Sequence, residues 1–132
     1  MYHIVIGVDE ESDRARKQAQ AVVNLPRAAD EVRATVLHVF TRNVEGASVS
    51  QFAPARAARD VLEAAGIEVT LAEDSGDPGR QVLDQAERLD ADLVSVAGRK
   101  RSPAGKAVFG SVSQSVMLDS EIPVLFCPAE PE

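Results

Sequence analysis

Hydrophobic and polar positions along this chain alternate between the period of a β-strand and that of an α-helix. Short apolar runs, typical of strands buried on both faces, occupy Tyr2–Val8, Val32–Phe40, Leu93–Ala97 and Ile122–Cys127. A further run, Ile67–Ala72, alternates apolar and polar residues and predicts a strand nearer the edge of a sheet. The apolar pattern therefore predicts five strands in all.

Amphipathic segments separate these runs and predict helices. They cover about Ser12–Asn24, about Pro54–Ala65, a stretch that starts at Asp77-Pro78, and roughly Ser111–Leu118. Ser12 or Asp13 is expected to cap the first helix, and Gly66 to follow the end of the second. Asp77 supplies a capping carboxylate to the third helix, with Pro78 at its first position.

Strands and helices that alternate in this way indicate an α/β fold with a parallel, doubly wound sheet and helices on both faces. The length of 132 residues suits one domain, 1–132, and the chain shows no repeat, low-complexity tract or linker. Ligands of such sheets bind outside the carboxyl ends of the strands, where the strand order reverses. The long polar loop Thr41–Phe52 follows the second strand, in a position from which it could close over a ligand.

The composition excludes several classes of protein. A net charge of -7 argues against a nucleic-acid-binding domain, which needs a basic surface. No apolar run approaches the roughly 20 residues of a membrane helix, and the N-terminus lacks the pattern of a signal peptide. The single cysteine, Cys127, rules out an internal disulfide. We therefore expect a cytoplasmic protein with neither a nucleic-acid partner nor a membrane partner.

Candidate chemistry gathers after the fourth strand. The segment Gly110–Ser113 opens the last helix, whose unpaired first N–H groups and dipole favour an anion. Gly110 allows close approach to the backbone, and Ser111 and Ser113 add hydroxyl donors. Just before it, four basic side chains fall within eight positions: Arg99, Lys100, Arg101 and Lys106. This pattern favours a phosphate site, although a capping box of Ser111 with Gln114 and a solvated basic loop would produce it too.

Catalytic chemistry has little support in the sequence. His3 and His38 lie in or beside strands, where a lone histidine is more often packed than catalytic. The chain has no nucleophile elbow, no P-loop of the GxxxxGK[ST] type and no cluster of metal ligands. Cys127 is expected to behave as a small buried hydrophobe. We therefore expect no enzymatic activity, since nucleotide hydrolysis would need a water-activating group that the sequence does not offer.

Four segments in order resemble the universal stress protein family, and together they span nearly the whole chain. They are Ile4-Val5-Ile6-Gly7-Val8-Asp9, Leu37-His38-Val39, Gly76-Asp77-Pro78, and Gly110-Ser111-Val112-Ser113 leading to Ile122-Pro123-Val124-Leu125. The resemblance implies a Rossmann-like, adenine nucleotide α-hydrolase-like fold with a five-stranded parallel sheet in the order 3-2-1-4-5. It also implies a homodimer, paired through the last strand. One branch of the family binds ATP, and another lacks nucleotide.

The resemblance also implies a set of site residues. It places the adenosine beside Asp9 and an apolar wall of the adenine pocket at Val39, although Asp9 could instead cap the first helix and Val39 could simply pack in the core. Ala97 and Lys100 stand where the ATP branch has two glycines of its phosphate loop, while Gly98 is out of register. The whole predicted site comprises Gly7, Val8, Asp9, Val39, Val96, Ala97, Gly98, Lys100, Gly110, Ser111, Val112 and Ser113.

Two hypotheses about function follow. The first is a homodimeric stress-response module that binds an adenine nucleotide, ATP with Mg²⁺, between the first and fourth strands. The second is a nucleotide-free dimeric interaction or regulatory protein, in which the basic loop around Lys100 binds another anion or a partner. The preserved Asp9 favours the first hypothesis, and the two replaced glycines favour the second.

Overall fold

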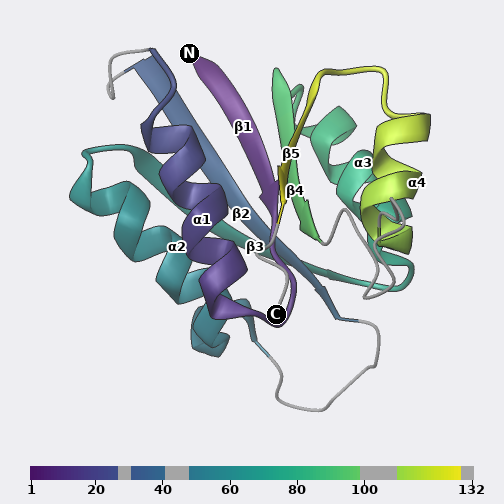
Figure 1. Ribbon diagram of the computed structural model, residues 1–132, viewed down its shortest axis with the longest axis horizontal. Helices are drawn as coiled ribbons and strands as arrows, with labels where there is room; N and C mark the ends of the chain where they lie inside the picture. The colour runs from purple at the N-terminus through teal and green to yellow at the C-terminus, as the bar shows by residue number, and fades with distance from the viewer. Residues whose placement is uncertain (27–30, 41–47, 99–109, 129–132) are drawn as a thin grey trace.

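A computed structural model describes residues 1–26, 31–40, 48–98 and 110–128. Its strands form one parallel sheet in the order β3-β2-β1-β4-β5, so the predicted fold class and strand order are confirmed (Figure 1). The strands are β1 (Tyr2–Gly7), β2 (Val32–Phe40), β3 (Glu68–Ser75), β4 (Leu93–Gly98) and β5 (Val124–Pro128).

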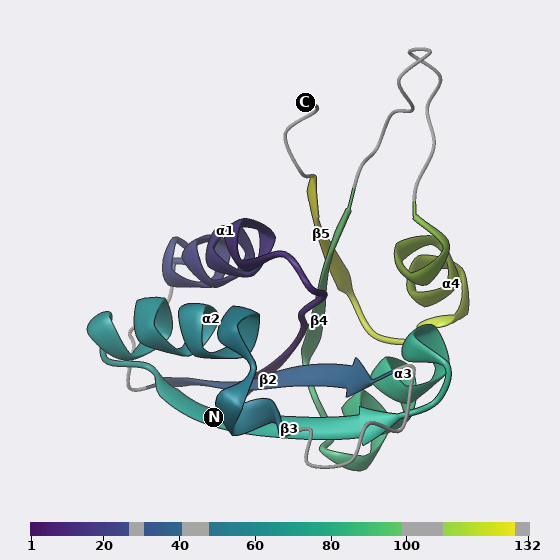
Figure 2. The ribbon, with the colours of Figure 1, turned by 90° about the horizontal axis from the view of Figure 1, so that it is seen from below.

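In the described parts of the chain, four α-helices cover the sheet, two on each face. Figure 2 shows α1 (Ser12–Val23) and α2 (Ala53–Ala64) on one face, and α3 (Pro78–Arg88) and α4 (Ser111–Asp119) on the other. Within the described ranges, none of the helices combines the length and the apolar character needed to cross a bilayer.

The strand period decides which helices each residue of β1 contacts. Successive side chains of a strand point to opposite faces, and Ile4 and Ile6 belong to the core beneath α1 and α2. Val5 belongs instead to the core beneath α3, together with Leu37 and Val94. All five side chains are fully buried, which explains why the central strands are apolar at nearly every position.

Two of the three predicted helix ends are confirmed. The Asp77 carboxylate accepts a hydrogen bond from the Arg80 N–H at 3.1 Å and caps α3. Gly66, just beyond α2, has a φ of 82°, in the left-handed region that favours glycine after a helix. The predicted cap of α1 is wrong. The helix already includes Ser12, so its N-cap is Glu11, whose side chain makes no capping bond. Asp9 accepts the Glu11 N–H at 2.9 Å and holds the turn that precedes the helix.

Several predicted boundaries also differ from the structure. The third strand runs on to Ser75 because β2 pairs with it as far as Phe40 opposite Ser75. The last strand begins at Val124 and ends at Pro128, and thus lies two residues later than predicted at its start. The end of the predicted loop Thr41–Phe52 contains a short 3-10 helix, η2 (Val49–Gln51), in which the apolar Val49 is buried. Residues 41–47, and with them most of the suggested lid, lie outside the described residues.

Candidate functional site

A pocket of about 520 Å³ opens at the carboxyl ends of β1 and β4, between which the strand order reverses. Its volume lies within the range of about 300–1,000 Å³ usual for small-molecule sites. Apart from Lys100, which lies outside the described residues, every predicted site residue lines this pocket: Gly7, Val8, Asp9, Val39, Val96, Ala97, Gly98, Gly110, Ser111, Val112 and Ser113.

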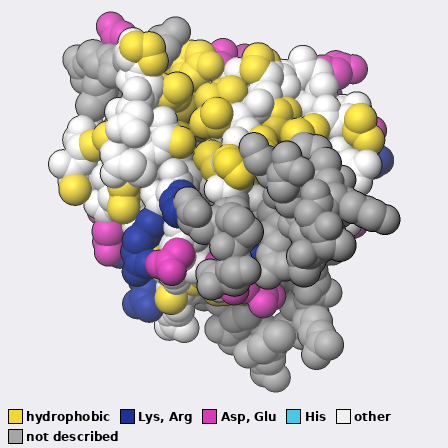
Figure 3. Space-filling model, in the orientation of Figure 1, with side chains coloured by type: hydrophobic (Ala, Val, Ile, Leu, Met, Phe, Trp, Pro, Cys, Tyr) yellow, Lys and Arg dark blue, Asp and Glu magenta, His cyan; other side chains and the backbone are white. Residues whose placement is uncertain are grey.

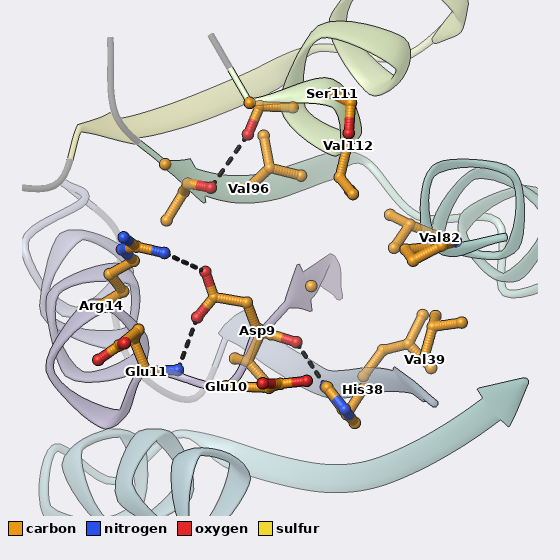
Figure 4. A pocket seen from close by; sticks show the side chains of 18 residues that line it. Asp9, Glu10, Glu11, Arg14, His38, Val39, Val82, Val96, Ser111 and Val112 are labelled. Atoms are coloured by element: carbon orange, nitrogen blue, oxygen red, sulfur yellow. Dashed lines mark hydrogen bonds and ion pairs between the residues drawn. The ribbon is translucent and has the colours of Figure 1, made fainter. Parts of the chain in front are cut away.

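One end of the pocket is apolar. Val39 comes from the end of β2, Val82 from α3 and Val112 from the first turn of α4, and Figure 4 shows the three on the same side of the cavity. Val39 and Val82 are buried, whereas Val112 is 36% exposed. Val39 therefore contributes to the core and to the pocket wall, the two roles that the sequence left open.

The opposite end is charged and centres on Asp9, which follows β1. One carboxylate oxygen accepts the N–H of Glu11 at 2.9 Å. The other accepts a hydrogen bond from Nη1 of Arg14, on the first turn of α1, also at 2.9 Å. Both side chains stay partly accessible, at 41% for Asp9 and 29% for Arg14. Asp9 thus fixes the turn into α1 and still faces the cavity (Figure 4).

The first turn of α4 lies beside the carboxyl end of β4. Its N-cap is Gly110, which has no side chain of its own to cap the helix, so the predicted capping box of Ser111 and Gln114 does not form. The register is the reason: Ser111 is already the first helical residue, and the N–H of Gln114 bonds to the Gly110 carbonyl at 2.9 Å. Among the described residues, none would lie within 4 Å of a Cβ added to Gly110, so they leave space beside the backbone at this helix start.

The two serines of this turn have different surroundings. Ser111 is exposed on the pocket wall. Ser113 is only 2% exposed, and its hydroxyl donates to the Ala97 carbonyl at 3.0 Å. The expectation that Ser113 offers a free hydroxyl donor is therefore wrong, because this hydroxyl already joins α4 to β4.

Several pocket-lining residues were missed by the sequence analysis: Glu10, Glu11, Arg14, Leu37, His38, Pro78 and Val82. Glu10, Glu11, Leu37 and His38 lie within two positions of predicted site residues, so their place in the chain was a usable signal. Arg14, Pro78 and Val82 lie farther away along the chain, and only the fold brings them to the pocket.

Histidine and cysteine side chains near the site have structural surroundings. The ring of His38 stacks on Phe52 with a centroid separation of 3.9 Å, and its Nδ1 bonds to the Val8 carbonyl at 2.8 Å. Burial raises the pKa of the Cys127 thiol, which agrees with the expectation of an unreactive cysteine. In the part of the chain that the structure describes, no three His, Cys, Asp or Glu side chains come together as a metal site would require.

Comparisons with known proteins agree with this geometry. Residues 1–128 match the Universal stress protein family. The stress response protein NhaX of Bacillus subtilis is 38% identical over 50 residues, which cover 38% of this chain and 30% of that protein. A universal stress protein from Archaeoglobus fulgidus is 27% identical, with a TM-score of 0.79 over 96% of this chain and 98% of that one.

Two further structures of the same fold contain adenine nucleotides. One is a universal stress protein in complex with cAMP, 24% identical, with a TM-score of 0.75 and coverage of 98% of both chains. The other, from Arabidopsis thaliana, has AMP bound and is 16% identical, with a TM-score of 0.69 over 98% of this chain and 93% of that one. At these identities the likeness concerns the fold alone.

Proposed function

Because the chain belongs to the universal stress protein family, we propose that it is a homodimeric stress-response module that binds an adenine nucleotide, ATP, between β1 and β4. The observation that carries the proposal is the pocket itself. Residues that are far apart in the sequence, from Gly7 to Ser113, line one cavity of about 520 Å³. That cavity has an apolar end suited to a base and a charged end suited to a ribose and phosphates (Figure 4).

Each part of the nucleotide has residues that fit it. Val39, Val82 and Val112 offer an apolar slot for adenine. Within the described residues, each carboxylate oxygen of Asp9 accepts one hydrogen bond, and a carboxylate has about four lone-pair positions, so Asp9 can still accept a hydrogen bond from a ribose hydroxyl. The first turn of α4 begins at Gly110, which has no side chain to occupy its N–H groups, and these groups suit a phosphate.

Any Mg²⁺ is expected to arrive with the phosphates. The described residues contain no group of three potential metal ligands, so the metal would be held chiefly by nucleotide oxygens, as is usual for this ion. We further propose that the bound nucleotide is not turned over. Among the described residues, Asp9 already pairs with Arg14, and the buried ring of His38 is engaged by Val8 and Phe52.

Isothermal titration with Mg-ATP, at high protein concentration in physiological salt, tests the proposal. Saturable heat is expected from the wild type, and Asp9→Ala should reduce it. Asp13→Ala is a matched control because Asp13 pairs with Arg16 on the outer surface of α1, with a side chain 91% exposed. Absence of heat from the wild type would refute nucleotide binding and favour the nucleotide-free alternative. Native mass spectrometry of freshly purified protein adds a second check, since a co-purified ATP or AMP rejects that alternative.

The proposed dimer rests on β5, the last strand of the sheet. This strand pairs with β4 along one edge, so its other edge carries backbone groups that a second copy can pair with. Beside it lies a groove whose walls include Tyr2, Leu25 and Leu125, and Figure 3 shows apolar side chains gathered on this face of the molecule. Sedimentation equilibrium should give twice the mass of one chain, and a single-chain mass at high concentration would refute the dimer.

A further inference from the structure

Arg14 is the one lysine or arginine among the described residues that line the pocket. It lies on the first turn of α1, and its side chain is 29% exposed. Figure 4 shows its guanidinium beside Asp9, at the end of the cavity opposite Val39 and Val82. A nucleotide whose base fills the apolar end and whose ribose contacts Asp9 therefore brings its phosphate toward Arg14 as well as toward the first turn of α4.

The guanidinium has spare hydrogen-bonding capacity. It carries five N–H donors in a planar fork that matches a phosphate group. Within the described residues, one of these donors is taken, by the Asp9 carboxylate at 2.9 Å. This bond holds the guanidinium in place at the cavity and leaves the other donors for a ligand. Asp9 is thus a positioning residue for Arg14, besides its proposed contact with the ribose.

The acidic residues around Arg14 make its charge more important for a phosphorylated nucleoside than for adenosine. Asp9, Glu10 and Glu11 also line this end of the pocket, and three carboxylates without a cation repel a phosphate. A neutral adenosine does not experience that repulsion. Removal of the Arg14 charge should therefore weaken the binding of a phosphorylated nucleoside and leave the nucleoside itself almost unaffected.

We propose that Arg14 binds the phosphate of the nucleotide and makes the pocket selective for adenosine phosphates over adenosine. This inference rests on the proposed function, because it assumes that adenosine occupies the pocket. It assigns the discrimination to a side chain of α1, on the wall of the pocket formed by the turn after β1.

Titration of AMP and of adenosine into the wild type, Arg14→Gln and Arg16→Gln tests the proposal. Charge-assisted hydrogen bonds contribute enough for Arg14→Gln to weaken AMP binding by about tenfold or more, and adenosine binding should change by less than about twofold. Arg16→Gln is the matched control. It makes the same substitution on the same helix, but Arg16 pairs with Asp13 and its side chain is 55% exposed. AMP should bind this control as it binds the wild type.

The outcomes separate the two proposals. If the wild type binds AMP and Arg14→Gln loses none of that affinity, or loses AMP and adenosine affinity equally, the inference is wrong and the proposed function stands. If the wild type binds neither compound, the proposed function fails and the inference fails with it. Should Arg14→Gln not fold, Arg14→Met provides the test. It keeps a long side chain and removes the charge, so weaker AMP binding with unchanged adenosine binding supports the role of Arg14, and unchanged AMP binding contradicts it.

Discussion

Replacement of the two serines at the start of α4 by alanine should separate a structural hydroxyl from an accessible one. Ser113→Ala removes a hydroxyl that is 2% exposed and donates to the Ala97 carbonyl at 3.0 Å. Ser111→Ala removes an exposed hydroxyl two residues away on the same helix. Both variants make the same substitution in the same helix, and they differ only in what the removed hydroxyl contacts.

The expected magnitude follows from that contact. A buried hydrogen bond contributes about 1 kcal/mol to the free energy of unfolding, and more if its partner is left unpaired. Alanine in a helix recovers roughly 0.5 kcal/mol relative to serine. Ser113→Ala should therefore lose about 0.5–1.5 kcal/mol, whereas Ser111→Ala should stay within about 0.5 kcal/mol of the wild type.

Urea denaturation followed by circular dichroism measures the difference. With a slope of about 2 kcal/mol per molar urea for a small domain, Ser113→Ala should unfold about 0.5 M below Ser111→Ala. If nucleotide binds as proposed, Ser111→Ala should lower the affinity for the nucleotide, because it removes a hydroxyl that the phosphate can contact. Ser113→Ala should leave that contact unchanged. Coincident unfolding midpoints for the two variants would refute the structural role given to Ser113.

Three further predictions concern stability, each measured by the urea midpoint. Gly79→Ala should lower the free energy of unfolding by about 1–2 kcal/mol. The new Cβ would lie 2.9 Å from the Oγ and 3.1 Å from the Cβ of Ser115. Adding Ser115→Ala should recover only part of this loss, because the Ser115 Cβ remains. Asp77→Ala removes the cap of α3 and should cost about 1 kcal/mol; an unchanged midpoint would contradict that cap. Burial, with a smaller effect of the Arg33 charge, lowers the pKa of His3 below its ordinary 6.5. The folded state therefore favours neutral His3. This contribution to the free energy of unfolding is fully present above pH 6.5 and is lost as the pH falls through the folded-state pKa. Between pH 7.5 and pH 5, His3→Gln should therefore lose less stability than the wild type.

The sequence predicted the architecture well because apolar periodicity and strand burial have the same cause. Ile4 and Ile6 face one core and Val5 faces the other, so the segment has to be apolar at every position. Asp77 was predictable as a cap because it is followed by proline, and Gly66 because few other residues adopt a positive φ after a helix. These are local rules, and the local sequence contains all the information that they need.

The errors arose where a local pattern competes with a contact made elsewhere in the fold. Ser12 is a residue type that favours helix caps, but the turn held by Asp9 leads into a helix that already includes Ser12 and starts without a side-chain cap. Ser111 with Gln114 has the spacing of a capping box, yet α4 begins one residue too early for it. Arg14 was missed because its role depends on where the turn after β1 brings its guanidinium, and helical periodicity does not report that.

The alternation of side chains between the two faces of β4 explains how Ala97 fits where the family resemblance places a glycine. Ser95 faces α1, where its hydroxyl accepts a bond from Gln18 at 3.2 Å, so Ala97 points to the same face and Gly98 to the opposite one. A Cβ at position 98 would lie 3.2 Å from the Ser113 Oγ, so the packing of α4 on β4 favours glycine there whether or not a ligand is bound. Gly98 is therefore not a displaced copy of the phosphate-loop glycine that the family resemblance places at position 97. The single methyl of Ala97 lies on the face that α1 covers, the helix that carries Arg14. If phosphate binding in this chain relies on Arg14, the alanine at position 97 lowers the affinity for the phosphate only slightly. Ala97→Gly should therefore change the affinity for AMP far less than Arg14→Gln does.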